Sequence, residues 1–222
     1  MAITALVFDF DGLLMDTESS MLASWQQEWR RHGLELDVST FFANHGGDLT
    51  AQRYEQLAAA VGPAFDRAVS HARRIAHRDR MHAELELAPG IRAWLDRARE
   101  LGLRLAVASS SPRAWVTRLL ATTGYLDRFE TLACGDEVGA PKPDPAVYTL
   151  AVTRLAVPAT QALAFEDAPH GVTAAAGAGL RCVAVPNPFA DPSRFAHAAL
   201  VLPSASAMPL DEVLTVAARP VR

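Results

Sequence analysis

Several side chains that could do chemistry stand directly after short apolar runs of this sequence. Two aspartates follow the run at 3–8, and a glutamate and an aspartate follow the run at 162–165. If one fold gathered these carboxylates, they would repel one another unless a cation lay among them. Oxygen ligands of this kind suit a hard ion such as Mg²⁺. The carboxylates are those of Asp9, Asp11, Glu166 and Asp167.

A serine pair and a lysine add the means to hold an anion beside that cation. Ser109 opens a Ser-Ser-Ser-Pro stretch before a predicted helix, where Ser109 and Ser110 offer hydroxyl and backbone N–H groups. Lys142 is the only lysine among 21 lysines and arginines. A chain that otherwise uses arginine would keep a lysine where a compact point charge is needed. The pattern predicts a phosphoryl group held by Mg²⁺, a helix N-terminus and Lys142.

A parallel sheet would bring these residues to one edge. The apolar runs are rich in branched side chains, which is typical of buried parallel strands. Segments with helical spacing lie between them, and this alternation predicts a parallel sheet with helices on both faces. Ligands of such sheets bind outside the carboxyl ends of the strands. The sequence therefore predicts an α/β fold with a doubly wound, Rossmann-like parallel sheet. Its predicted strands are 3–8, 103–108, 131–134, 162–165, 182–185 and 200–202.

The segment 16–87 has a different pattern and contains no convincing strand. Its apolar residues follow helical spacing, and an arginine-rich stretch follows the break at Gly62-Pro63. A helical segment of this length, inserted directly after the first strand, predicts a second, all-helical domain. The predicted boundaries are 1–15 with 88–222 for the sheet domain and 16–87 for the helical domain.

Composition and charge narrow the class of protein. Of the 222 residues, 50% are hydrophobic and 21% are charged, which is ordinary for a globular protein. A net charge of −4 argues against binding to nucleic acid or to a membrane surface. Neither an apolar run of about 18 residues nor a secretion signal is visible. We expect a cytoplasmic monomer that acts on a small molecule.

No part in the chemistry is expected for the two cysteines or for four of the histidines. Cys134 and Cys182 make no disulfide framework or zinc motif and are predicted to be buried as small apolar residues. Four histidines show no metal-ligand spacing and are predicted to lie on the surface: His32, His71, His82 and His197.

The order of the motifs along the chain carries a family resemblance. Each motif alone has a structural explanation, since serine runs and aspartates often cap helices and turns, but here all of them stand in order at strand ends. The sequence resembles the haloacid dehalogenase superfamily of phosphohydrolases, in the branch with a small helical cap inserted after the first motif. The resemblance implies that 1–15 and 88–222 form the catalytic core and that 16–87 form the cap. The matching motifs are DFDGLLMDTE at 9–18, Ser109, PKPDP at 141–145 and FEDAPHG at 165–171.

The resemblance also implies a role for each matched residue. Asp9 would be the nucleophile that forms an aspartyl phosphate, and Asp11 would protonate the leaving alcohol and then deprotonate the attacking water. Ser109, Ser110 and Lys142 would balance charge on the phosphoryl oxygens. The residues that would hold Mg²⁺ are Asp9, Asp11 through its main-chain carbonyl, Asp167, and Glu166 directly or through water.

More than one activity is compatible with this resemblance. The favoured one is a Mg²⁺-dependent phosphatase of a small phosphorylated metabolite, such as a sugar phosphate. A β-phosphoglucomutase-type mutase is the alternative, although that branch carries a histidine where this chain has Met21. True haloacid dehalogenases lack the second aspartate of the first motif, so the presence of Asp11 argues against that activity. A non-catalytic phosphate-binding module would be marked by loss of Asp9 or Asp11, and both are present. The cap would select the substrate, through a loop expected at 44–48.

Overall fold

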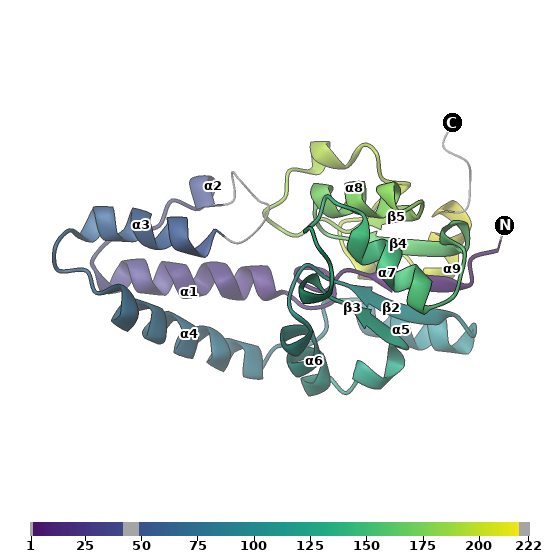
Figure 1. Ribbon diagram of the computed structural model, residues 1–222, viewed down its shortest axis with the longest axis horizontal. Coiled ribbons are helices and arrows are strands. Elements are labelled where there is room, and N and C mark those ends of the chain that lie inside the picture. The colour runs from purple at the N-terminus through teal and green to yellow at the C-terminus, as the bar shows by residue number, and fades with distance from the viewer. Residues whose placement is uncertain (1, 42–48, 218–222) are drawn as a thin grey trace. The chain divides into compact units, whose positions relative to one another are not determined.

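The computed structural model describes residues 2–41 and 49–217 of the chain (Figure 1). Contacts between residues in space divide the chain into two compact units. One unit is Met1–Asp16 together with Glu86–Arg222, and the other is Thr17–Leu85. The first unit contains the sheet, and the second contains helices. The roles of these units as catalytic core and cap stay predictions.

The sheet has six strands in the described residues, all paired in parallel, in the order β3-β2-β1-β4-β5-β6. Every strand overlaps one of the predicted apolar runs, which confirms the doubly wound, Rossmann-like α/β fold. β1 lies between β2 and β4, so the strand order reverses beside it, where such sheets bind ligands. The strands are β1 (Ala5–Phe8), β2 (Arg104–Ala108), β3 (Thr131–Ala133), β4 (Ala162–Glu166), β5 (Arg181–Ala184) and β6 (Leu200–Val201).

Helices cover both faces of this sheet (Figure 1). On one face α7 contacts β1, β2 and β3, and α8 contacts β4 and β5. On the other face α5 contacts β2 and α9, and α9 also contacts β5 and β6. The helices of this unit are α5 (Ile91–Glu100), α6 (Arg113–Thr122), α7 (Ala146–Arg154), α8 (Pro169–Gly177) and α9 (Leu210–Ala217).

The pleat of the strands gives the two faces different side chains. Ala5 and Val7 of β1 share one buried apolar cluster with residues of α7 and α8. On the opposite face Phe8 stacks on Phe165 with 4.7 Å between ring centroids, and Trp94 of α5 packs on Phe165 at 5.0 Å. The close packing of both faces holds the ends of β1 and β4 in fixed positions.

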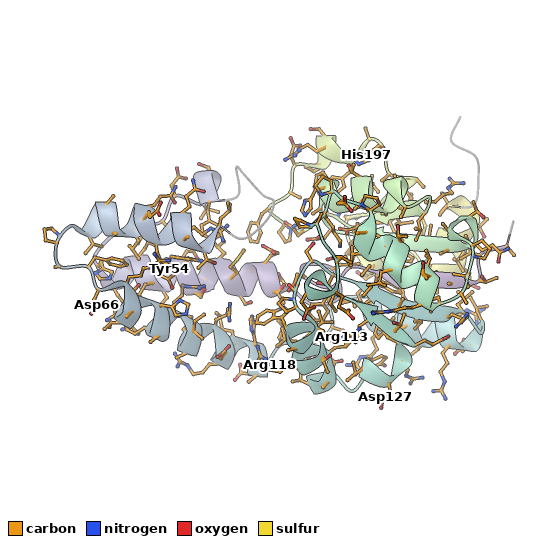
Figure 2. All side chains as sticks on the ribbon, in the orientation of Figure 1. Tyr54, Asp66, Arg113, Arg118, Asp127 and His197 are labelled. Atoms are coloured by element: carbon orange, nitrogen blue, oxygen red, sulfur yellow. The ribbon has the colours of Figure 1, made fainter. Side chains whose placement is uncertain are left out.

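The helical unit contains four described helices, and α1 and α4 pack along each other. Asp66 caps α4, where its side chain accepts the backbone N–H of Val69 at 3.0 Å (Figure 2). The loop expected at 44–48 lies outside the described residues. No helix in the described ranges combines the length and the apolar character needed to cross a membrane. The helices are α1 (Thr17–Arg31), α2 (Val38–Phe41), α3 (Thr50–Val61) and α4 (Arg67–Ala83).

Polar side chains are buried between these helices. The Nε of Arg74 donates to the hydroxyl of Tyr54 at 2.8 Å. His82 is buried, and its ring lies 2.7 Å from the hydroxyl of Ser20, so the prediction that His82 lies on the surface is wrong. His82 follows Ser70 and Arg74 at multiples of four residues, which places all three on one face of α4. That face is the buried one.

Candidate active site

Three neighbouring strands deliver the predicted site residues to one place. Asp9 follows β1, Ser109 follows β2, and Glu166 ends β4 with Asp167 directly after it. The backbone N–H of Asp9 donates to the carbonyl of Phe165 at 2.9 Å, which continues the ladder between β1 and β4 past the end of β1. This bond sets Asp9 beside Glu166.

Lys142 is buried at the centre of the site. Its ammonium group donates to the carboxylate of Asp9, to the carboxylate of Glu166 at 2.6 Å and to the backbone carbonyl of Ala108 at 2.9 Å. These three bonds use all three donors of an ammonium group. Burial lowers the pKa of Lys142, but Asp9 and Glu166 outweigh the effect of burial and hold this pKa above its usual range. Lys142 is therefore charged.

The carboxylate of Glu166 is enclosed by further donors. Its Oε1 accepts the hydroxyl of Tyr148 at 2.7 Å. Its Oε2 accepts the backbone N–H groups of Asp167 at 3.1 Å and of Ala168 at 3.4 Å, where α8 begins. A Cβ atom on Gly171 would lie 2.0 Å from this carboxyl group, so the close approach of α8 requires glycine there.

Asp9, Glu166 and Asp167, here termed the buried acidic cluster, are close enough to share a metal ion. Their carboxylate oxygens lie within 4.8 Å of one another, and all three residues are buried. The side-chain amide of Asn187 donates to Asp167 at 2.7 Å and so orients that carboxylate. These three residues could therefore hold a cation.

The charge of the buried acidic cluster favours such a cation. Lys142 pairs with two of these three buried carboxylates, those of Asp9 and Glu166. Burial raises the pKa of Asp9 well above its ordinary value, Lys142 opposes that rise, and Glu166 adds to it. Additional positive charge among these oxygens would keep Asp9 ionised, and the all-oxygen donor set suits a hard divalent ion. The residues present therefore fit a metal ion of this kind.

The side chain of Asp11 is bonded to the segment that follows β2. The hydroxyl of Ser111 donates to it at 2.6 Å, and the indole N–H of Trp115 donates at 3.0 Å. The hydroxyl of Ser109 lies 3.5 Å from the same carboxylate and accepts the backbone N–H of Ser111 at 3.0 Å. Ser109 is buried, whereas Ser110 is exposed. The structure thus brings Ser109 next to Asp11 and leaves the side chain of Ser110 on the surface.

Sequence reasoning missed the residues that support this site. Tyr148 looks like one member of an apolar helical stripe, although a buried tyrosine hydroxyl usually needs a partner. Ser111 belongs to the Ser-Ser-Ser-Pro stretch, where spacing alone does not tell which hydroxyl meets Asp11. No spacing signal points to Trp115 or Asn187, because each reaches the site from a separate segment of the chain.

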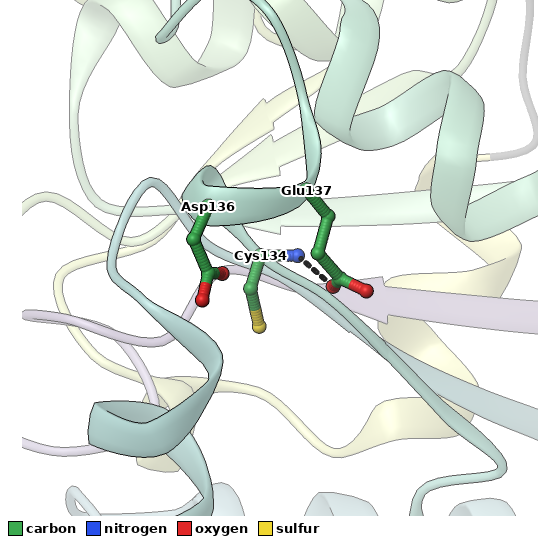
Figure 3. Close-up of side chains that lie close together, drawn as sticks. All are labelled: Cys134, Asp136 and Glu137. Carbon is green, nitrogen blue, oxygen red and sulfur yellow. Dashed lines mark hydrogen bonds between the residues drawn. The ribbon is translucent and has the colours of Figure 1, made fainter.

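A second compact group, Cys134, Asp136 and Glu137, is here termed the arginine-paired cluster (Figure 3). Glu137 pairs with Arg154 at 2.8 Å and with Arg113 at 2.9 Å, and these hydrogen bonds lower the pKa of Glu137 to about 2. Asp136 accepts the backbone N–H of Arg113 at 3.0 Å. Burial raises the pKa of the Cys134 thiol to about 11, so the thiol stays protonated at neutral pH. The charges of this cluster are already balanced, and it does not fit a metal site.

Comparisons with known proteins show what the chain is similar to. The family model "Haloacid dehalogenase-like hydrolase" matches residues 6–185. YhcW of Bacillus subtilis (strain 168), assigned as a phosphatase, is 38% identical over 186 residues and the match covers 83% of this chain and 84% of YhcW. The fructose-1-phosphate phosphatase YqaB of Escherichia coli (strain K12) is 32% identical over 184 residues, 81% of this chain and 95% of YqaB. A crystal structure from Thermotoga maritima, assigned as a β-phosphoglucomutase, aligns with a TM-score of 0.83 at 26% identity over 96% of this chain and 100% of its own.

The family match and the site agree with each other. The matched range 6–185 contains Lys142 and the whole of the buried acidic cluster. The site combines carboxylates, a lysine and hydroxyl groups, and the relatives YhcW and YqaB are named as phosphatases. The chain belongs to the haloacid dehalogenase-like hydrolases and is a phosphoric monoester hydrolase.

Proposed function

We propose that this hydrolase is a Mg²⁺-dependent phosphatase that acts on a small phosphorylated metabolite, such as a sugar phosphate, through an aspartyl phosphate on Asp9. The observation that carries this proposal is Lys142, which is buried and bonded to both Asp9 and Glu166. A fixed cation beside a nucleophilic carboxylate orients that carboxylate and can stabilise negative charge on the phosphoryl group during transfer. The name of YqaB, a fructose-1-phosphate phosphatase, supports a sugar phosphate as the substrate.

The proposed holders of Mg²⁺ are the side chains of Asp9 and Asp167 and the main-chain carbonyl of Asp11, with Glu166 directly or through water. Four donors already surround the carboxylate of Glu166, which favours the contact through water because a carboxylate has about four lone-pair sites. When bound, Mg²⁺ supplies positive charge that keeps Asp9 ionised and polarises a phosphoryl oxygen.

The proposed reaction has two steps, and each exchanges one bond at phosphorus and transfers one proton. In the first, an oxygen of Asp9 bonds to phosphorus as the bond to the leaving oxygen breaks, and Asp11 gives its proton to that oxygen. In the second, Asp11 takes a proton from water, the water oxygen bonds to phosphorus, and the bond to Asp9 breaks. Ser109, the backbone N–H of Ser110 and Lys142 balance charge on the phosphoryl oxygens in both exchanges.

The helical unit Thr17–Leu85 is the cap in this proposal and selects the leaving group. A cap that closes over a substrate excludes water from the first exchange. The proposed state of the enzyme is a monomer, which light scattering of the purified protein checks.

A phosphosugar mutase is the second candidate, favoured by the likeness to the Thermotoga maritima structure assigned as a β-phosphoglucomutase. The residue at the position of the mutase histidine argues against it. Met21 stands there, and its sulfur accepts a hydrogen bond from Arg53 at 3.4 Å. A thioether can neither give nor take a proton in acid–base catalysis, so the phosphatase is the better-supported function.

A substrate panel tests the proposal directly. Phosphate release is measured from sugar phosphates, polyol phosphates, nucleotides and p-nitrophenyl phosphate, with Mg²⁺ and with excess chelator. We expect release from at least one sugar or polyol phosphate that depends on Mg²⁺. Conversion of β-glucose 1-phosphate to glucose 6-phosphate in the presence of a bisphosphate primer, without net phosphate release, would establish the mutase instead.

A further inference from the structure

The carboxylate of Asp11 accepts hydrogen bonds from donors of two kinds, an indole N–H and serine hydroxyls. Trp115 donates its indole N–H to Oδ1 at 3.0 Å, and Ser111 donates its hydroxyl to Oδ2 at 2.6 Å. Each carboxylate oxygen therefore has a donor of its own, and bonds to both oxygens fix the orientation of the carboxylate plane.

The beginning of α6 aims Trp115 at Asp11. Pro112 precedes the helix, and the backbone N–H of Trp115 donates to the carbonyl of Pro112 at 3.0 Å, which places Trp115 in the first turn. Side chains of a helix tilt toward its N-terminus, and this end of α6 follows directly from the loop beside Asp11. Arg118, labelled in Figure 2, lies over the indole ring with 5.2 Å between its guanidinium carbon and the ring centroid. This contact limits rotation of the ring.

The two kinds of donor differ in what they allow on the oxygen they contact. An indole N–H can donate but cannot accept, whereas a serine hydroxyl can do either. We propose that Trp115 is a positioning residue, which reserves Oδ1 of Asp11 as an acceptor and turns Oδ2 toward the proton exchanges with the leaving oxygen and with water. This inference rests on the proposed function, in which Asp11 acts first as an acid and then as a base.

An orienting role of this kind predicts a dependence on the leaving group. The alkoxide of a sugar or polyol phosphate must take up a proton as it leaves, whereas p-nitrophenolate is stable without one. Loss of the indole donor should therefore slow hydrolysis of an alkyl phosphate more than hydrolysis of p-nitrophenyl phosphate. The effect should appear in kcat rather than in KM, because Trp115 acts through Asp11 and not on the bound ester.

Trp115→Phe removes the indole N–H and keeps an aromatic ring on α6. We expect kcat for the best alkyl phosphate of the panel to fall roughly 10- to 100-fold, since general acid catalysis contributes about 10²–10⁴-fold in all. The kcat for p-nitrophenyl phosphate should change much less. Trp94→Phe is the matched control, because Trp94 lies on α5 and its indole donates to the carbonyl of Met208 at 2.9 Å, outside the site. Equal losses on both substrates in Trp115→Phe would overturn the proposal.

A double-mutant cycle separates positioning from a merely structural role. If Trp115 acts through Asp11, Trp115→Phe should cause no further loss with the alkyl phosphate in an Asp11→Ala background. A loss of the same size in both backgrounds would mean that Trp115 supports α6 in general, which contradicts the proposal.

The hydrogen bond can also be observed without changing Trp115. The chain has four tryptophans, and the ¹⁵N–¹H signal of the Trp115 indole should move in Asp11→Ala while those of the other three stay in place. A Trp115 signal that does not move would overturn the proposal even if Trp115→Phe failed to fold. A native enzyme that released phosphate from no ester would contradict the proposed function instead, and the signal would still report on the bond.

Discussion

The buried acidic cluster and the arginine-paired cluster are both compact, since the ligand atoms of each lie within 4.8 Å of one another. Their charge balance differs. Lys142 pairs with two of the three carboxylates of the first, Asp9 and Glu166, whereas Glu137 of the second pairs with two arginines. The pKa of Asp9 is accordingly raised by burial, and hydrogen bonds to arginine lower the pKa of Glu137 to about 2. Burial of the carboxylates, rather than closeness of acidic residues, distinguishes the candidate catalytic site.

Removing the nucleophilic charge should have the largest effect. Asp9→Asn keeps the size of the side chain but removes the attacking carboxylate, so we expect kcat/KM to fall by at least about 10³-fold. Glu137→Gln makes the same chemical change in the arginine-paired cluster and should leave turnover near that of the native enzyme. Assays of both purified variants with the best substrate of the panel check this contrast. Retained activity in a folded Asp9→Asn protein would rule out the proposed nucleophile.

Exchanging the cation should have the next largest effect. Lys142→Arg keeps the charge but puts a broad planar group where three bonds converge on one ammonium nitrogen. We expect the barrier to rise by roughly 2–4 kcal/mol, as for the loss of an electrostatic donor. Arg154→Lys is the matched reverse exchange in the arginine-paired cluster and should change kcat little. Native kinetics in Lys142→Arg would show that the shape of the cation is unimportant.

Binding of a metal should stabilise one cluster only. Mg²⁺ at about 100 times its dissociation constant should add about 2.7 kcal/mol to the free energy of unfolding if it binds the native state alone. This gain, measured as a shift of Tm in thermal unfolding, should disappear in Asp167→Asn and persist in Asp136→Asn. A shift that vanished in Asp136→Asn but not in Asp167→Asn would place the metal in the arginine-paired cluster and contradict the proposed site.

The arginine-paired cluster should contribute to stability in a defined pH range. The pKa of Glu137 is lowered from 4.5 to about 2, so its contribution is complete above pH 4.5 and is lost as the pH falls toward 2. We expect this contribution to be about 1 kcal/mol, because the partner arginines are partly exposed. Urea unfolding of the native protein and of Glu137→Gln across this range should give curves that converge at low pH. A constant difference between them would show that Glu137 does not act through its charge.

The strands were predictable because each is a short run of apolar, branched residues between polar segments. The predicted run 162–165 ends one residue before β4 does, because a charged residue usually ends an apolar run. Glu166 continues the strand because Tyr148 and the start of α8 satisfy its buried carboxylate. Lys142 could be singled out by its rarity, whatever its role.

The supporting contacts were not predictable, because they depend on how separate segments meet. Trp115 resembles any aromatic residue near the start of a helix until the placement of α6 beside Asp11 is known. His82 is buried because Ser20, 62 residues away in the sequence, supplies its hydrogen-bond partner. Side-chain type alone favours the surface for histidine only weakly, so such a residue is assigned by its partner rather than by its pattern.

The measurement that tests the central claim most directly is chemical trapping of the phosphorylated enzyme. The native protein is mixed with its best substrate and Mg²⁺, quenched in denaturant, and treated with borohydride, which reduces an acyl phosphate to a primary alcohol. Peptide mass spectrometry then locates the modified residue. We expect Asp9 to be converted to homoserine in the native protein, with no conversion without substrate. Homoserine at another position, or none during active turnover, would contradict Asp9 as the residue that carries the phosphoryl group.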